Sequence, residues 1–217
     1  MERKNAVLVI AGPSAVGKTV VAKAIVERDP RFTFLRSGTT RAKRGDANDD
    51  EYLYYTEDEF LAAVGRGEFA EHMRYGGNLY GTPKSELFGA IKRGKIPLMV
   101  LDLNGVESLA KLSEFSACSV YIYAPIENIE ARLAERYLGD GKTPEREALY
   151  KTRTEQNKAD YGVIDAYADY IFSFIENNST IDACRDRVMD EFSDFCEGVE
   201  YPREANKKTA ARLKDSV

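Results

Sequence analysis

The stretch Val7-Leu8-Val9-Ile10-Ala11-Gly12-Pro13-Ser14-Ala15-Val16-Gly17-Lys18-Thr19 decides the fold that we expect for this chain of 217 residues. Its first five residues are apolar and mostly β-branched, which predicts a strand buried on both faces of a parallel sheet. A helix is predicted for residues 16–28, with Val21 and Ile25 on its apolar face. It ends before Asp29-Pro30, because the residue before a proline avoids the helical region. A buried strand, a glycine-containing turn and a helix in direct succession indicate an α/β fold.

Residues 12–19 match the pattern G-x-x-x-x-G-K-[ST] between that strand and that helix. Glycines let successive backbone N–H groups converge on phosphate oxygens, and the helix N-terminus adds a favourable partial charge. Lys18 can reach the outer phosphates, and the Thr19 hydroxyl can ligate Mg²⁺. A tight turn without a ligand is the alternative, but the Lys-Thr ending and the flanking elements favour a loop that binds a nucleoside triphosphate. The predicted triphosphate-binding residues are Gly12, Pro13, Ser14, Ala15, Val16, Gly17, Lys18 and Thr19.

Apolar runs further along the chain predict more strands of the same sheet. Residues 96–101, 119–123 and 170–175 are such runs and alternate with helical patterns, as expected of a parallel α/β core. Asp102 follows the first run directly. A carboxylate at the carboxyl end of a central strand, beside a phosphate loop, can order Mg²⁺ or its waters. A role for Asp102 in capping the next helix is the alternative.

Two segments interrupt this core pattern. Residues 36–94 contain short aromatic strands around a helix that opens at Thr56, where Thr56 and Glu59 can cap each other's backbone N–H groups, and we expect an inserted lobe. Residues 127–164 are mostly charged and helical, and the break at Gly139-Asp140-Gly141 suits a mobile lid. The predicted divisions are a core of residues 1–35, 95–126 and 165–197, a lobe of residues 36–94, a lid segment of residues 127–164 and a polar tail of residues 198–217.

The overall composition excludes several classes of protein. The chain carries 31 Lys and Arg residues against 36 Asp and Glu, a formal net charge of -5, so it repels polyanions and a general nucleic-acid role is not expected. Three cysteines without C-x-x-C spacing favour reduced thiols in a cytoplasmic protein. No apolar run is long enough for a signal peptide or a membrane span, which favours a soluble protein. Residues 198–217 offer little apolar surface, so we expect a frayed helix or disorder there.

A second anion site is predicted early in the lobe. Arg36, Arg41, Lys43 and Arg44 place four positive charges in nine residues of an otherwise acidic chain, with glycine and hydroxyl residues between them. Such a cluster is often only a solvated surface, but the intervening hydroxyl groups favour a clamp for a second phosphate group. Two anion sites that face each other predict the transfer of a phosphoryl group from one to the other.

Five segments carry a resemblance to a known family: GPSAVGKT at residues 12–19, SGTTRAKR at 37–44, EYLYY at 51–55, EFAEH at 68–72 and GNLYGTP at 77–83. They resemble guanylate kinase in the family's order and at nearly its spacing, over about residues 6 to 196. The resemblance implies a P-loop NTPase three-layer fold with a parallel central sheet, an inserted mixed α/β lobe that binds the nucleoside monophosphate, and a helical lid. It also implies phosphorylation of GMP, and of dGMP, by ATP with Mg²⁺ as the cofactor.

Matching positions assign the acceptor residues and the lid arginines. A carboxylate such as Glu71 can accept from both N1–H and the 2-amino group of guanine, which adenine lacks. Arg132 and Arg136 lie four apart on one face of the predicted lid helix, and Arg153 follows the glycine break. These arginines, with Lys18 and Arg41, are expected to neutralise charge on the transferring group, without a general base. The residues implied to hold the GMP phosphate are Ser37, Arg41, Arg44, Tyr52 and Tyr80, and those implied to read guanine are Glu71 and Thr82.

Three further positions are compared with the family's pattern. Asp102-Leu103-Asn104-Gly105 is shorter than the family's segment, and Asn104 stands where a second acidic contact to GMP is expected. This departure leaves another phosphorylated acceptor open as the alternative. Ala15 replaces a loop glycine, which we interpret as tolerable because it adds no bulk against phosphate. Asn178, after the last predicted strand, resembles the family's contact to the adenine edge.

Two other classes of protein share some of these motifs. Regulatory GTPases contain D-x-x-G and N-K-x-D, which this chain has at residues 102–105 and 157–160, but residues 151–156 are charged and helical in character rather than a buried strand. A non-catalytic guanylate-kinase-like module would need no donor site, and the intact Lys18 and Thr19 argue against it. The expected partners are ATP and GMP, without nucleic acid or membrane, in a monomer or homodimer.

Overall fold

The computed structural model describes residues 4–43, 49, 52–75, 77–139 and 141–217. Arg44, one of the residues expected to hold the GMP phosphate, lies outside the described residues. Asp140, in the predicted glycine break, lies outside them as well.

Five parallel strands form the central sheet, in the order β2-β7-β1-β8-β9. The middle strand, β1, is buried on both faces from Val7 to Ala11, as its unbroken apolar run predicts. The last strand begins three residues later than predicted: Tyr170 ends the 3₁₀ helix η2 (Ile164–Tyr170), and Ile171 and Phe172 connect that helix to the strand. The strands are β1 (Ala6–Ala11), β2 (Phe32–Phe34), β7 (Ile96–Val100), β8 (Ser116–Tyr123) and β9 (Ser173–Glu176).

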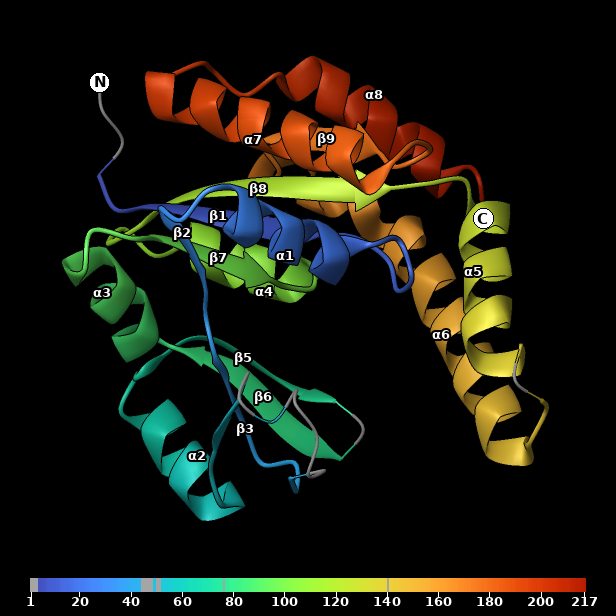
Figure 1. Ribbon diagram of the computed structural model, residues 1–217, viewed down its shortest axis with the longest axis horizontal. Coiled ribbons are helices and arrows are strands. Elements are labelled where there is room, and N and C mark those ends of the chain that lie inside the picture. The colour runs from blue at the N-terminus through green and yellow to red at the C-terminus, as the bar shows by residue number, and fades with distance from the viewer. Residues whose placement is uncertain (1–3, 44–48, 50–51, 76, 140) are drawn as a thin grey trace.

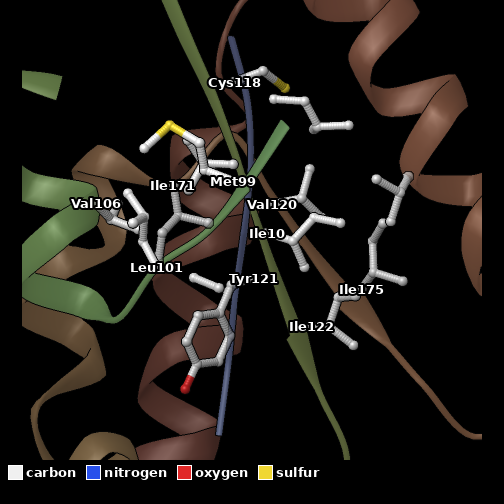
Figure 2. Close-up of a cluster of buried hydrophobic side chains, with 14 of the residues drawn as sticks. Ile10, Met99, Leu101, Val106, Cys118, Val120, Tyr121, Ile122, Ile171 and Ile175 are labelled. Carbon is white, nitrogen blue, oxygen red and sulfur yellow. The ribbon is translucent and has the colours of Figure 1, made fainter. Parts of the chain in front are cut away.

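Helices cover both faces of this sheet and complete the three layers (Figure 1). The helices α1 (Lys18–Arg28) and α7 (Ile181–Glu197) pack against each other, and α4 (Leu103–Ala110) packs against η2. Alternate residues of a strand point to opposite faces, so each strand contributes to two apolar layers. Figure 2 shows Ile10, Val120, Ile122 and Ile175 on one side of the strands and Met99, Leu101, Val106 and Tyr121 on the other.

A second, mixed sheet lies in the region predicted as the lobe, in the order β4-β3-β6-β5. Strands β3 and β4 are parallel and the other pairs are antiparallel. The predicted reciprocal cap opens α2, since Thr56 Oγ1 accepts from Glu59 N–H and the Glu59 carboxylate accepts from Thr56 N–H. The elements are β3 (Ser37–Thr39), β4 (Tyr52–Tyr54), α2 (Glu57–Gly65), β5 (Phe69–Tyr75), β6 (Asn78–Pro83) and α3 (Lys84–Lys92).

Helices α5 (Ile126–Leu138) and α6 (Pro144–Val163) pack together as a pair that extends away from the sheet (Figure 1). Only the part of the pair next to the sheet is buried: Leu133 on α5 and Tyr161 on α6 belong to the main apolar cluster. The break between the two helices falls where the glycines predict it. None of the helices in the described part of the chain has the length and apolar character needed to cross a membrane.

Residues 203–214 of the tail form the helix α8 (Arg203–Lys214), so a helix is present as one of the two expectations had it, but it is packed rather than frayed. Asn206, Ala210 and Leu213 are buried, and they lie on one helix face because they are spaced by four and three residues. Asn206 Nδ2 donates to the backbone oxygens of Ile171 at 2.7 Å and Phe172 at 3.1 Å. Only two residues of this buried face are apolar, so the sequence pattern does not reveal it. The third, Asn206, can be buried because its side chain pairs with backbone oxygens.

We expect Leu213→Ala to lower the free energy of unfolding by roughly 2–4 kcal/mol, because Leu213 is 5% exposed and its truncation leaves a cavity under α8. Urea denaturation followed by circular dichroism measures this. Leu61→Ala, at a leucine that is 48% exposed, is the control and should change the free energy by no more than about 0.5 kcal/mol. Equally small effects of both substitutions would contradict the packed position of α8.

Candidate active site

The loop between β1 and α1 has the backbone that its glycines predict. Gly12 has φ of 143° and Gly17 has φ of 105°, a region that L residues rarely adopt. A Cβ atom at Gly12 would lie 2.1 Å from the carbonyl oxygen of Ile122 in β8, so no other residue fits there. Gly17 precedes α1 directly, which places the unpaired N–H groups of the first helical turn at the loop.

Ala15 adopts a left-handed backbone with φ of 65°. This region costs an L residue roughly 1–2 kcal/mol, whereas glycine enters it freely. The interpretation of Ala15 as tolerable for its small size therefore misses the relevant property, which is backbone conformation rather than bulk. Contacts elsewhere in the structure must hold Ala15 in this conformation.

Lys18 lies folded against the loop, where its Nζ donates to the carbonyl oxygens of Gly12 at 2.7 Å and Pro13 at 2.8 Å. The pKa of Lys18 is lowered to about 8, chiefly by desolvation; Asp160 opposes this shift, Arg153 adds to it, and Asp102 opposes it. The structure thus brings Arg153, predicted from the sequence as a lid residue, within electrostatic range of Lys18. Asp160 was not identified from the sequence as part of this group.

Asp102 ends the strand-to-helix turn after β7, as predicted, and it also caps α4. Its Oδ1 accepts from Gly105 N–H at 2.7 Å. The capping role weighed as an alternative is therefore present, and it orients the carboxylate at the carboxyl end of the sheet. Within the described residues, no three His, Cys, Asp or Glu side chains are grouped to hold a metal ion.

Two buried asparagines, which the sequence did not single out as functional, hold the phosphate loop. Asn157 on α6 is 1% exposed, and its side chain pairs with both the N–H and the C=O of Ser14. Asn177, after β9, is 7% exposed and its Nδ2 donates to the carbonyl oxygen of Val16 at 2.8 Å. Asn178, the predicted adenine contact, is exposed, and its Nδ2 donates to Glu176 at 3.2 Å. Its contact to adenine stays a prediction, and the neighbouring Asn177 is the residue that bonds to the loop.

The predicted lid arginines differ in where they lie. Arg132 on α5 donates from Nη2 to the backbone oxygen of Asn177 at 3.2 Å, which places it beside the loop. Arg136 is exposed, and its guanidinium carbon lies 5.5 Å from the ring centroid of Tyr137. Of the two, only Arg132 contacts a residue that holds the phosphate loop.

In the lobe, the strand pairing gathers the residues expected to hold the second phosphate. The guanidinium carbon of Arg41 lies 5.0 Å from the ring centroid of Tyr52, and the rings of Tyr52 and Tyr80 are 6.3 Å apart. Ser37 pairs with Tyr52 in the register of β3 and β4. Arg41 Nη1 is buried and has no hydrogen-bond partner among the described residues. A buried guanidinium donor of this kind favours an anionic ligand.

Asp49 is a further member of this cluster that the sequence did not indicate. Its Oδ1 accepts from Tyr54 OH at 2.5 Å and lies 3.4 Å from Arg41 Nη2. Burial and the hydrogen bond to Asp49 raise the pKa of Tyr54 to about 12. Arg41, at 11% side-chain exposure, is therefore partly neutralised by a carboxylate of the same lobe.

Glu71 and Thr82 face each other across β5 and β6, as the predicted guanine site requires. Thr82 Oγ1 donates to Glu71 Oε1 at 2.7 Å, and both residues are buried. Burial raises the pKa of Glu71 to about 7, the Thr82 hydrogen bond opposes this, and Asp102 adds to it. Asn104 is not part of this pair: it is exposed on α4, and its Oδ1 accepts from Tyr167 OH at 2.8 Å. The acidic group that contributes to the raised pKa of Glu71 is Asp102.

Comparison with known proteins decides the family, since the sequence model of guanylate kinase matches residues 4–193. The chain belongs to the guanylate kinase family. It is a nucleoside monophosphate kinase, a transferase, with the P-loop NTPase fold expected from its sequence. Family membership favours neither a regulatory GTPase nor a non-catalytic module, and residues 157–160 lie inside α6 rather than after a strand.

Individual relatives agree with this assignment. The guanylate kinase of Thermotoga maritima is 38% identical over 169 residues, which are 77% of this chain and 78% of that protein. The guanylate kinase of Paramagnetospirillum magneticum is 34% identical over 138 residues, 63% of this chain and 64% of that protein, so that alignment spans just under two thirds of the relative. A crystal structure of guanylate kinase from Anaplasma phagocytophilum has a TM-score of 0.64 at 21% identity and covers 89% of this chain and 87% of that one. This last likeness shows the shared fold.

We expect the Glu71→Gln variant of this kinase to become more stable than the natural protein as pH rises. Because the pKa of Glu71 is raised from 4.5 to about 7, the native carboxyl keeps its proton in that window while the unfolded chain loses it, so the group lowers the free energy of unfolding as pH increases. Glutamine, which can still accept from Thr82, removes this loss. The variant should match the natural protein near pH 4.5 and exceed it by on the order of 3 kcal/mol at pH 8.

Urea denaturation at several pH values measures this difference. Glu68→Gln is the control, because Glu68 is exposed and its pKa is lowered by Arg66, so its removal gives no gain at high pH. A difference between Glu71→Gln and the natural protein that is independent of pH would contradict the assigned pKa.

Proposed function

We propose that this guanylate kinase family member transfers the terminal phosphoryl group of ATP to GMP, between an anion site at the phosphate loop and another at Arg41. The observation that carries the proposal is the presence of the buried Glu71–Thr82 pair together with these two anion sites. The Asp102 carboxylate raises the pKa of both Glu71 and Lys18, so the acceptor pair and the donor loop both lie within electrostatic reach of one residue. That arrangement suits two nucleotides bound with their phosphates facing.

On the donor side, the backbone N–H groups of residues 12–19 bind the phosphates of ATP, and Lys18 moves its ammonium from the loop carbonyls to the outer phosphates. Thr19 and Asp102 offer a hydroxyl and a carboxylate, oxygen ligands that suit Mg²⁺, and we assign the ion to them. When bound, the ion neutralises charge on the phosphates. Asn178, after β9, is assigned the contact to the adenine edge.

On the acceptor side, Arg41 clamps the GMP phosphate together with the hydroxyl groups of Ser37, Tyr52 and Tyr80, and Arg44 contributes a second charge. Glu71 accepts from N1–H and from the 2-amino group of guanine. The Thr82 hydroxyl holds one Glu71 oxygen at 2.7 Å and thereby orients the carboxylate toward the base. dGMP presents the same base and phosphate, and it is the second acceptor that we propose.

The transfer requires alignment and charge neutralisation rather than a general base, because the acceptor phosphate is already anionic. Arg132 and Arg153 stand beside the loop, and Arg136 reaches the phosphates when α5 and α6 close over them. Asn104 stays a predicted contact to GMP. Its hydrogen bond to Tyr167 directs it to η2, so base recognition rests on Glu71 and Thr82. The reaction is assigned to the cytoplasm. The oligomeric state that we propose is a monomer or a homodimer.

We expect GMP to be phosphorylated far faster than AMP, CMP or UMP in an assay that measures ADP formation from ATP and Mg²⁺. Guanine alone among these bases offers two adjacent donors to a carboxylate, and a buried Glu71 left unpaired disfavours the others strongly. Glu71→Gln should lower kcat/KM for GMP by roughly 100-fold or more while leaving KM for ATP unchanged. Equal rates with AMP and GMP would refute the assignment of the base site.

We expect Lys18→Ala to abolish turnover and Arg41→Ala to reduce it mainly through KM for GMP, since Lys18 serves the donor and Arg41 the acceptor. Steady-state kinetics with each substrate varied in turn separates the two effects. Arg66→Ala is the control, because this exposed arginine of the same lobe pairs with Glu68 at 2.6 Å and is assigned no phosphate. Loss of ATP rather than GMP affinity in Arg41→Ala would contradict the assignment of the second anion site.

A further inference from the structure

The helix α6 holds the phosphate loop through a buried side chain to which the proposed chemistry assigns no role. Asn157 Oδ1 accepts from Ser14 N–H at 2.7 Å, and its Nδ2 donates to Ser14 C=O at 3.2 Å. The two residues are 143 positions apart in the sequence, and Asn157 is 1% exposed. A carboxamide that pairs with both backbone groups of one residue restricts the rotation of that residue's peptide planes.

These hydrogen bonds orient loop N–H groups through the rigidity of the peptide unit. The C=O of Ser14 shares a planar trans peptide with the N–H of Ala15, so the two groups point in opposite directions. Holding the Ser14 C=O toward Asn157 therefore directs the Ala15 N–H away from α6. Asn177, which donates to Val16 C=O at 2.8 Å, directs the Gly17 N–H in the same manner. The two asparagines thus act on alternate peptide planes of the loop.

Between these two planes lies Ala15, whose left-handed φ of 65° is unfavourable for alanine and free for glycine. A glycine at this position would reach the conformation without help. An alanine reaches it only where neighbouring contacts over-determine the backbone. Asn157 and Asn177 supply such contacts on both sides of Ala15.

The same hydrogen bonds also place Arg153. Arg153 precedes Asn157 by four residues on α6 and so lies on the same helix face, one turn away. It lies within electrostatic range of Lys18. The anchoring of Asn157 to Ser14 therefore sets the distance between the Arg153 guanidinium and the loop that Lys18 serves.

We propose that Asn157 is a positioning residue for phosphoryl transfer: it holds the phosphate loop, with Ala15 in its left-handed conformation, in the shape that receives the triphosphate, and it anchors Arg153 beside it. The inference rests on the proposed binding of ATP at this loop. If that function is wrong, the unmodified protein shows no ATP turnover with any acceptor. If only the inference is wrong, the unmodified protein is active and the variants below fail to separate.

The first test compares Asn157→Ala with Asn206→Ala. Both asparagines are buried and pair with backbone groups, but Asn206 lies on α8 and bonds to Ile171 and Phe172, away from the loop. We expect Asn157→Ala to raise KM for ATP roughly tenfold with KM for GMP within about twofold, since it loses two hydrogen bonds that shape the donor site only. Both variants should lower the urea concentration at the unfolding midpoint to a similar extent. Asn206→Ala, however, should change neither KM. Parallel changes in KM in both variants, or an equal rise in KM for GMP, would overturn the proposal.

The second test uses the coupling of Asn157 to Ala15 in a double-mutant cycle. Because glycine needs no help to adopt a positive φ, Asn157→Ala should raise KM for ATP by only about two- to threefold in the Ala15→Gly background, against about tenfold in the natural one. If Asn157→Ala alone does not fold, recovery of folding in the double variant supports the proposal. An effect of Asn157→Ala that is the same in both backgrounds, or a loss of folding that Ala15→Gly does not restore, refutes it.

Discussion

The close approach of the phosphate loop to the strand beside it is the constraint on which the rest of the structure depends. The Gly12 backbone lies against the carbonyl oxygen of Ile122, so close that a Cβ atom would meet it at 2.1 Å. This contact requires β1 in the middle of a parallel sheet with β8 at its side, and it aims the loop at the N-terminus of α1. Once the loop is there, every other functional group of the proposed site has to reach the same edge of the sheet, where parallel strands end.

Charge is concentrated at this edge in a chain whose net charge is negative. Lys18 is desolvated, which lowers its pKa, and its ammonium is held by the carbonyl oxygens of Gly12 and Pro13. Arg41 is held by Asp49 on one side, and its buried Nη1 has no hydrogen-bond partner within the part of the chain that the structure describes. The carboxylates of Asp160 and Asp102 oppose the lowering of the Lys18 pKa. The two proposed anion sites are thus local groups of positive charge in a chain with a formal net charge of -5.

The parts of the fold that were predictable are those in which neighbouring residues decide the outcome. The buried run of β1, the loop glycines, the stop at Asp29-Pro30 and the reciprocal cap at Thr56 all act within a few residues, and the structure has each of them. The sequence left a helix or disorder open for α8 and did not indicate that it packs, because its buried face consists of two apolar residues and an asparagine that pairs with the backbone of another segment. For the site, the motif positions were sufficient to place Glu71 with Thr82 and Arg41 with Tyr52 and Tyr80, since strand register brings those residues together.

The sequence by itself determined the phosphate loop, the alternation of strands and helices and the identity of the family, because these are written in short stretches whose backbone requirements are local. Only the tertiary structure decided which buried amides support that loop. Asn157 and Asn177 come from α6 and from the end of β9, and nothing near them in the chain distinguishes Asn177 from Asn178. The strain at Ala15 was also decided by the tertiary structure. Nothing in the sequence indicates a positive φ for this alanine, which follows from contacts made by residues far away along the chain.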